Sequence, residues 1–333
     1  MRIFSGIQPT GRKQLGNYLG AIIHYLAGQD RGEGIYCLVD LHSLTVAYDP
    51  AALREYLYDT TAILLAAGLD PSRCILFRQS DVKEHTELCW LLANVTAYGE
   101  LGRMTQFKEK SAEQRDFVSA GLFFYPVLMA ADILAYQTNE VPVGDDQRQH
   151  IELTRDIAQR FNARFGETFV LPEARIPEVG SRIMDLQVPE KKMSTTGGTE
   201  LGTVYVLDEP DVIRRKFKGA VTDSGREIVR GPGKAGITNL IEILATVRAV
   251  EPQAIEKEFA GASGYAGFKE EVGNAVADYL TTVRERYAAL RPDVRALEEI
   301  LAAGAEKARA ISSRTVARAR DRMGVGPPGS RPS

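Results

Sequence analysis

The sequence predicts an α/β fold in which a doubly wound parallel sheet, with helices on both faces, is followed by an all-helical C-terminal domain. The first half of the chain alternates short apolar runs with helical patterns. A strand–helix–strand order of this kind indicates parallel strands joined by helical crossovers. Beyond about residue 201 the strand signals fade, and helical patterns dominate residues 211–322. A chain of 333 residues can bury a large core, in one large or two closely packed domains.

Four short apolar runs, each bounded by turn residues, are the predicted strands. They cover residues 3–7, 35–41, 75–78 and 141–143. A helix is predicted between the second and third runs. Asp49 suits its N-cap, Pro50 its first position and Gly68 its end.

A long amphipathic helix is predicted to follow the last of these strands and to run through Phe165. Asp145 or Asp146 is expected to be its N-cap, because short acidic side chains accept hydrogen bonds from the first free N–H groups of a helix. The end of the chain, from Gly324, is rich in glycine, proline and serine and is predicted to be disordered.

Composition narrows the class of protein. The apolar fraction of 44% and the charged fraction of 26% are ordinary for a globular protein, and no apolar run approaches a bilayer span. The N-terminus has no signal-peptide pattern, and three widely spaced cysteines favour buried free thiols in the cytoplasm. A net charge of −3 argues against a globally basic DNA-binding protein, although it allows a local basic face.

The first candidate site is the stretch Phe-Ser-Gly-Ile-Gln-Pro-Thr-Gly at residues 4–11, followed by Gln-Leu-Gly-Asn at residues 14–17. A strand leads through small residues into the N-terminus of a helix, where free N–H groups favour phosphate. Gly16 would let an adenine or ribose approach the backbone. An ordinary strand-to-helix turn explains the stretch equally well. Neither a dinucleotide fingerprint nor a P-loop is present.

The second candidate site is the stretch Lys-Lys-Met-Ser-Thr-Thr-Gly-Gly at residues 191–198. A basic, glycine-rich loop can close over a triphosphate, because lysine is a point charge for phosphate. Loops of this composition are also common as solvated turns, so the stretch alone is a weak signal.

Together, these two stretches make the whole chain resemble the bacterial-type tryptophanyl-tRNA synthetases, a family of class I aminoacyl-tRNA synthetases. Residues 14–17 are similar to the family's first signature, HIGH, and residues 192–196 to its second, KMSKS. Residues 103–108 and 141–147 are similar to stretches that mark the bacterial tryptophan branch.

The resemblance implies a Rossmann-like catalytic domain over residues 1–200 with a helical insertion at about 100–140. It implies a helical tRNA- and anticodon-binding domain over residues 201–323, before the tail at 324–333. A symmetric homodimer is also expected from the family.

The helical pattern of residues 122–136 places Tyr125, Met129 and Asp132 on one apolar face, because they are spaced four and three apart. An acid on such a face is costly to bury without a partner. From the residues alone, a buried salt bridge or a solvent-facing Asp132 are the favoured explanations.

The resemblance instead implies that Asp132 accepts a hydrogen bond from the indole N–H of tryptophan, the only polar group of that side chain. Tyr125 and Gln147 would hold the α-amino group. His42 ends a predicted strand, where ligands bind in open α/β sheets. A structural histidine is the commoner case, but the family places this one beside the substrate. The implied substrate-binding residues are Phe4, Gly6, His42, Tyr125, Met129, Asp132, Ile133, Val143 and Gln147.

The reaction implied is activation of tryptophan by ATP, with release of pyrophosphate, and transfer of the acyl group to tRNA(Trp). ATP is expected to bring Mg²⁺, and no metal bound by the protein itself is expected. The implied ATP-binding residues are Gln8, Pro9, Thr10, Gly16, Asn17, Gly144, Asp145, Asp146, Ile183, Lys192, Met193, Ser194, Thr195 and Thr196. The implied catalytic residues are Gln8, Gln14, Asn17, Lys110, Lys192 and Thr195.

Two positions depart from the family pattern. Gln14 replaces the first signature histidine but still offers an amide donor to a phosphate oxygen. Thr195 stands where the second loop lysine is usual, and a neutral hydroxyl cannot neutralise charge on the leaving phosphates. A catalytically weakened paralogue with a regulatory or drug-resistance role therefore remains an alternative. A tyrosine-specific relative and a nucleotidyltransferase unconnected to tRNA are the others.

Basic clusters near the C-terminus are candidate contacts for tRNA phosphates. A solvated helix with ion pairs is the other explanation. The clusters comprise Lys307, Arg314, Arg318 and Arg322, and Arg214, Arg215, Lys216 and Lys218. His24, His85 and His150 belong to no recognisable pattern and are expected to be surface or packing residues.

Overall fold

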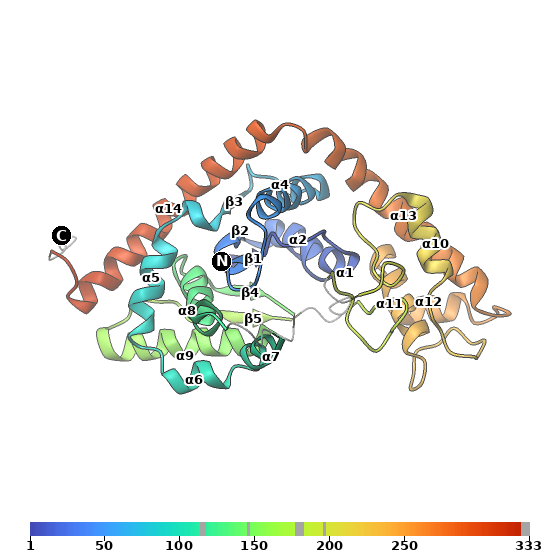
Figure 1. Cartoon of the computed structure of the whole chain (residues 1–333), viewed down its shortest axis with the longest axis horizontal. Coiled ribbons are helices and arrows are strands. Elements are labelled where there is room, and N and C mark those ends of the chain that lie inside the picture. Colours follow the sequence, from blue (N-terminus) through green and yellow to red (C-terminus); the bar gives the residue numbers. More distant parts are fainter. Residues whose placement is uncertain (114–117, 145–146, 177–182, 196–197, 328–333) are drawn as a thin grey trace.

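The computed structural model describes residues 1–113, 118–144, 147–176, 183–195 and 198–327. Within these residues, five parallel strands form a single sheet in the order β3-β2-β1-β4-β5 (Figure 1). The strands are β1 Arg2–Ile7, β2 Glu33–Leu38, β3 Cys74–Arg78, β4 Glu140–Pro142 and β5 Glu173–Arg175. The order reverses between β1 and β4, which confirms the predicted doubly wound sheet.

The sheet differs from the prediction at two places. The run predicted as a strand to residue 41 leaves the sheet after Leu38, and helix α3 Asp40–Ser43 follows at once. The turn lies at Val39, whose backbone has φ −85° and ψ 68°. Strand β5 was not predicted, because its three residues are all exposed and show no apolar alternation.

Helices cover both faces of the sheet, and the strand side chains alternate between them. Tyr36 and Leu76 pack with α2 Ile23–Arg31 and α4 Pro50–Ala67 on one face. Ile35 and Phe77 pack on the other face. The helices there are α5 Glu84–Ala93, α8 Ala120–Leu134 and α9 Arg148–Phe165.

Helix α4 has the predicted ends. The Asp49 carboxylate accepts a hydrogen bond from the N–H of Ala52 at 2.7 Å, and Pro50 is the first helical residue. Gly68 closes the helix with φ 114°, a left-handed conformation that glycine adopts without steric cost.

The cap predicted for α9 is wrong in position. Gln147 occupies its N-cap without a capping side-chain hydrogen bond, and Asp145 and Asp146 lie outside the described residues. Gly324 ends the last helix with φ 73°, and residues 328–333 of the predicted tail also lie outside the described part.

The remaining elements are mostly helical, and the helices predicted within residues 211–322 are confirmed. Before that region lie α1 Leu15–Asn17, a π-helical turn Tyr18–Ile22, the 3₁₀ turn η2 Gln79–Asp81, α6 Tyr98–Arg103 and α7 Thr105–Glu113. Within it lie α10 Pro210–Lys218, α11 Ala235–Arg248, α12 Pro252–Glu258, α13 Tyr265–Leu290 and α14 Val294–Met323. No helix in the described residues is long and apolar enough to cross a membrane.

Helix α14 leaves the helical region and runs back along the sheet (Figure 1). It packs on β3 so closely that a Cβ at Gly304 would collide with the carbonyl oxygen of Leu76. Leu301 and Ala305 of this helix belong to the two hydrophobic cores on either side of the sheet. The domain boundary at residue 200 stays a prediction. Helix α14 contacts the sheet although it lies in the predicted C-terminal domain.

Candidate functional site

A cavity of about 330 Å³ opens where the strand order reverses, at the carboxyl ends of β1 and β4. Ser5 and Gln8 reach it from β1 and the loop after it, and Pro142 and Gly144 reach it from the end of β4 and the residues after it. This edge is where open α/β sheets bind ligands, and the volume suits a small molecule.

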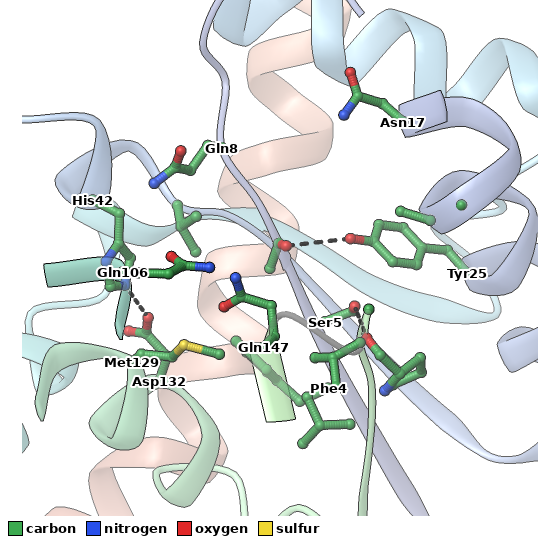
Figure 2. A pocket seen from close by; sticks show the side chains of 18 of the residues that line it. Phe4, Ser5, Gln8, Asn17, Tyr25, His42, Gln106, Met129, Asp132 and Gln147 are labelled. Carbon is green, nitrogen blue, oxygen red and sulfur yellow. Dashed lines mark hydrogen bonds and ion pairs between the residues drawn. The ribbon is translucent and has the colours of Figure 1, made fainter. Parts of the chain in front are cut away.

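Most of the predicted site residues come together here. The cavity is lined by Phe4, Gly6, Gln8, Gly16, Asn17, His42, Lys110, Tyr125, Met129, Asp132, Ile133, Val143, Gly144, Gln147, Ile183 and Lys192. Figure 2 shows Met129, Gln106 and Gln147 at the same end as Asp132, with Asn17 and Tyr25 at the other. The cavity therefore has one end around an acid and a second end beside the first signature loop.

The sequence analysis missed the lining residues Gly20, Ala21, Tyr25 and Val39. Four more lining residues lie in the stretches that it singled out but were not named individually: Ser5, Gln106, Val141 and Pro142. Gln106 lies in the stretch 103–108 that resembles the family, so a signal for it existed. Tyr25 lies outside every motif, and it is fixed by a hydrogen bond from its hydroxyl to the Gly6 carbonyl at 3.3 Å.

Asp132 is buried and held by three donors. His42 Nε2 lies 2.7 Å from Oδ2, while Gln79 Nε2 and His85 Nδ1 lie 2.8 Å and 2.5 Å from Oδ1. Burial alone would raise the pKa of Asp132, but hydrogen bonds from the two histidines outweigh it and lower the pKa to about 2. The carboxylate is therefore ionised at an end of the cavity that Met129 and Ile133 also line. The prediction that Asp132 faces solvent is therefore wrong, and the alternative prediction of a buried, paired Asp132 is confirmed.

The arrangement leaves this carboxylate able to accept once more. A carboxylate offers about four acceptor positions, and the three donors above use one on Oδ2 and two on Oδ1. A ligand donor entering from the cavity can therefore bind Oδ2 beside His42. A ligand that brings one N–H donor matches this remaining position.

Two histidines expected to be surface or packing residues belong to buried polar networks instead. His85 Nε2 lies 2.6 Å from the hydroxyl of Tyr136. His150 Nε2 lies 2.7 Å from the hydroxyl of Tyr125, a predicted substrate-binding group. The ammonium group of Lys110 lies over the ring of Tyr125, with Nζ 5.2 Å from the ring centre.

Gln14 does not face a phosphate as predicted. Its side chain is buried, where its oxygen accepts from the N–H of Gly16 and its Nε2 donates to the carbonyl of Met193 at 2.9 Å. The amide thus caps α1 and fastens the first signature loop to the second. The buried Met193, predicted to contact ATP, lies in the core and does not line the cavity.

Lys13, which was not predicted as a site residue, holds the loop that leads from β1 into the first signature. Its buried Nζ donates to the carbonyl oxygens of Gln8 at 2.7 Å and Thr10 at 3.2 Å. Burial lowers the pKa of Lys13 to about 8, and the charge of Asp59 opposes that shift. Pro9 and Thr10 contribute to the shape of this loop but do not line the cavity.

In the second loop, Lys192 lines the cavity, whereas Ser194 and Thr195 do not. Thr195 is exposed and lies beside Gly11, where its Oγ1 would be 3.6 Å from an added Cβ. The second signature loop therefore lies beside the loop that leads into the first signature. Thr196 lies outside the described residues.

One predicted tRNA contact is corrected. Lys216 is buried, with Nζ 2.7 Å from both Asp208 Oδ2 and the carbonyl oxygen of Thr203. Arg215 and Lys218 beside it are exposed, as are Arg314 and Arg318 on α14. Among the described residues, no group of histidine, cysteine and acidic side chains could hold a metal ion.

Comparisons with known proteins agree with this geometry. The family model described as tRNA synthetases class I (W and Y) matches residues 1–281. Tryptophan--tRNA ligase 2 of Streptomyces avermitilis is 49% identical over 98% of this chain and 97% of its own. The ligase of Wolinella succinogenes is 47% identical over 97% of this chain and 98% of its own.

Solved structures of the same kind superpose over nearly the whole length. The tryptophanyl-tRNA synthetase of Mycoplasma pneumoniae has a TM-score of 0.89 at 36% identity, with 98% of each chain covered. That of Campylobacter jejuni, solved with ADP and tryptophan, has a TM-score of 0.82 at 33% identity and covers 98% of this chain and 100% of its own.

Proposed function

The chain belongs to the class I tRNA synthetases of the tryptophan and tyrosine type, and we propose that it is the tryptophan–tRNA ligase of this family. It activates L-tryptophan with ATP to the adenylate, releasing pyrophosphate, and transfers the tryptophan to tRNA(Trp). The observation that carries the choice of tryptophan is the buried Asp132 carboxylate, with its one remaining acceptor position. Full-length identity of 47–49% to tryptophan–tRNA ligases supports the same choice.

Asp132 would let this cavity discriminate tryptophan from phenylalanine. The indole N–H would donate to Oδ2, while Met129, Ile133 and Phe4 would contact the rings. A phenylalanine side chain brings no donor and would leave a buried charge without its fourth hydrogen bond. A site built around a hydrogen bond rejects an analogue lacking it far more strongly than an apolar pocket rejects one methylene.

The other end of the cavity suits ATP. Gly16, Asn17, Gly144 and Ile183 would seat the adenosine, and Gln8 would face the α-phosphate. The tryptophan carboxylate attacks this phosphorus in line, and pyrophosphate leaves. Positioning and electrostatic stabilisation supply most of the catalysis in such a step.

The phosphates would face cations and amides of the chain. Lys110, Lys192 and Gln8 all line the cavity. Ammonium and amide groups complement a nucleotide that carries its own Mg²⁺, whereas carboxylates would be needed to hold the ion to the protein. The metal therefore belongs with the ATP substrate in this proposal, and it would neutralise charge on the leaving pyrophosphate.

We also propose a homodimer and a place in the cytoplasm. Trp90 on α5 and Tyr98 on α6 are 69% and 80% exposed, and large exposed aromatic side chains are enriched at protein interfaces. Light scattering should give twice the 36.6 kDa of one chain. A mass of one chain would contradict the dimer.

Aminoacylation of total tRNA with each of the twenty amino acids tests the function. Charging with tryptophan alone is expected. Charging with tyrosine would indicate the tyrosine-specific relative. Tryptophan binding without charging would indicate the weakened paralogue, and ATP hydrolysis without either would indicate an unrelated nucleotidyltransferase.

A further inference from the structure

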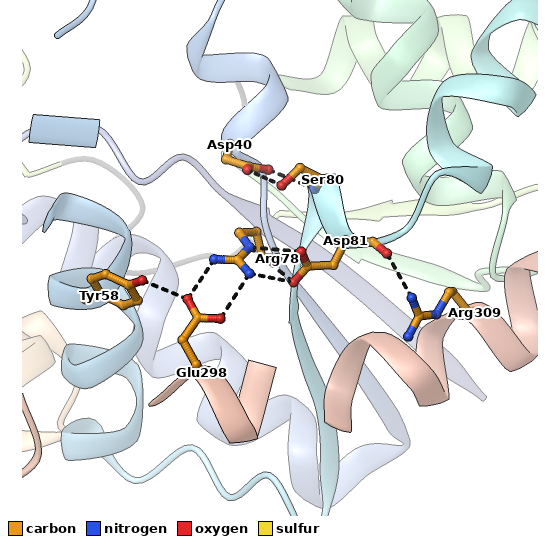
Figure 3. Close-up of polar contacts among 7 residues, drawn as sticks. All are labelled: Asp40, Tyr58, Arg78, Ser80, Asp81, Glu298 and Arg309. Carbon is orange, nitrogen blue, oxygen red and sulfur yellow. Dashed lines mark hydrogen bonds and ion pairs between the residues drawn. The ribbon is translucent and has the colours of Figure 1, made fainter. Parts of the chain in front are cut away.

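Helix α14 contacts the turn that follows strand β3 (Figure 3). Arg78, the last residue of β3, points toward α14. Its Nη1 and Nη2 lie 2.8 Å and 3.1 Å from the two carboxylate oxygens of Glu298, and its Nε lies 3.1 Å from both oxygens of Asp81. A two-pronged pair of this kind fixes direction as well as distance.

The same turn is held at further points. The hydroxyl of Tyr58, on α4, donates to Glu298 Oε1 at 2.8 Å. Ser80 donates from its N–H and its hydroxyl to the two oxygens of Asp40, at 3.0 Å and 2.6 Å. Arg309 of α14 donates to the carbonyl oxygen of Asp81 at 3.4 Å. Hydrogen bonds therefore hold the turn to α14 on one side and to the start of α3 on the other.

Gln79, between Arg78 and Ser80, points the opposite way, into the protein. Its Oε1 accepts from the N–H of Leu41 at 3.1 Å, and its Nε2 donates to Asp132 Oδ1 at 2.8 Å. A backbone N–H can only donate, so the amide oxygen must face Leu41 and the NH₂ group must face the carboxylate. This fully buried side chain can therefore serve Asp132 only as a donor.

We propose that Gln79 is a positioning residue for Asp132, the carboxylate that recognises tryptophan. We further propose that α14 keeps Gln79 in place through the Glu298–Arg78 pair. Gln79 follows Arg78 directly, so a movement of Arg78 displaces the amide that donates to Asp132. The strength of a hydrogen bond falls steeply with distance and angle. The C-terminal helix thus takes part in tryptophan affinity although it does not line the cavity. This inference rests on the proposed function.

The test compares kinetic constants in ATP–pyrophosphate exchange. Glu298→Gln keeps the shape of the side chain and removes the charge that holds Arg78. We expect the KM for tryptophan to rise about five- to tenfold, with kcat and the KM for ATP within about twofold, because only tryptophan contacts Asp132. Glu299→Gln is the matched control: this neighbour is exposed and pairs with Arg295 on its own helix, so no change is expected.

A second variant separates positioning from general stability. Gln79→Met removes the donor at similar length, and we expect the KM for tryptophan to rise at least as much as in Glu298→Gln. The double variant should be no worse than Gln79→Met, since both changes act through one hydrogen bond. If Glu298→Gln unfolds at assay temperature, Tyr58→Phe removes one donor from the same carboxylate and should raise the same KM.

Two outcomes overturn the inference and remain distinguishable. An unaltered chain without tryptophan-dependent exchange removes the proposed function, and the inference with it. An active unaltered chain whose KM for tryptophan stays the same in Gln79→Met and Glu298→Gln overturns the inference alone. Equal rises in the KM values for tryptophan and ATP also overturn it, because they indicate general damage.

Discussion

At the scale of single residues, the proposed function makes the charge on Asp132 the feature that selects tryptophan, and removing it gives the first prediction. Asp132→Asn turns one acceptor oxygen into an NH₂ group that faces donors from His42, Gln79 and His85. We expect the KM for tryptophan in pyrophosphate exchange to rise about 100-fold or more, because the indole N–H and the buried donors lose their acceptor. Asp156→Asn, the same change at an exposed acid that does not line the cavity, is the control. A KM within about threefold of the unaltered chain would contradict this role.

Thr195 gives the second prediction, because it stands beside Gly11 in the position of a loop lysine. Thr195→Lys adds a positive charge near the leaving phosphates. We expect pyrophosphate exchange to become faster by less than about tenfold, since Lys110 and Lys192 already line the cavity. Thr195→Met controls for length without charge. An increase above about 100-fold would show that no compensation exists and would favour the weakened paralogue.

Lys13 gives a prediction about pH. Its pKa is lowered by burial from 10.5 to about 8, so between these values the unfolded chain binds more protons than the folded one. Stability should therefore rise with pH across this window, and Lys13→Met should remove that rise. Urea unfolding at about pH 7.5 and 9.5 should show the difference between the two proteins changing by on the order of 2 kcal/mol. A constant difference would mean that the folded ammonium titrates normally.

At the scale of elements, the sequence predicted helix ends that depend on local capping residues, but it did not predict strands that depend on pairing with other strands. Asp49, Pro50 and Gly68 bound α4 because caps act within one turn of chain. Strand β5 exists because it pairs with β4, and its exposed residues carry no pattern. The end of β2 is likewise set by its neighbours rather than by its own apolar run.

The residues of the candidate site likewise fall into those that the sequence could identify and those that only the fold reveals. The two signature loops and Asp132 could be recognised by resemblance, and the cavity brings them together. Gln79 and His85 lie 53 and 47 residues from Asp132 in sequence, and only the fold makes them its donors. Sequence also does not show which way a polar side chain points, so Gln14 and Lys216 were assigned to ligands although both are buried.

Helix α14 gives the prediction at this scale, at its contact with β3. Gly304→Ala would place a methyl group against the carbonyl oxygen of Leu76. Alanine favours an isolated helix by about 1 kcal/mol, yet overpacking against backbone should reverse the sign and lower stability by about 1–3 kcal/mol. Urea unfolding measures it. Ala302→Gly, at an exposed position of the same helix, should lose only the propensity difference. A more stable Gly304→Ala variant would mean that α14 does not lie so close to the sheet.

At the scale of the whole molecule, α14 links the two parts that the reaction uses, the cavity in the sheet and the helical region where tRNA is expected. The chain is slightly acidic, with a net charge of −3, so tRNA must meet local basic faces rather than a general positive field. Two exposed clusters remain after the correction of Lys216: Arg214, Arg215 and Lys218 on α10, and Lys307, Arg314, Arg318 and Arg322 on α14. The pairs Arg215 with Lys218 and Arg314 with Arg318 represent the two clusters in the test below.

Replacing each pair by alanine tests which cluster contacts tRNA. Loss of two phosphate contacts should raise the KM for tRNA about tenfold and reduce the slope of its log–log salt dependence by about 1.5, because fewer counterions are released. Pyrophosphate exchange without tRNA should not change, since neither pair lines the cavity. Arg73→Ala, an exposed change at the amino edge of the sheet, is the control. If both double variants keep the KM and slope of the unaltered chain, the tRNA phosphates meet another face of the protein. If exchange falls together with charging, the clusters act through the fold and not through tRNA.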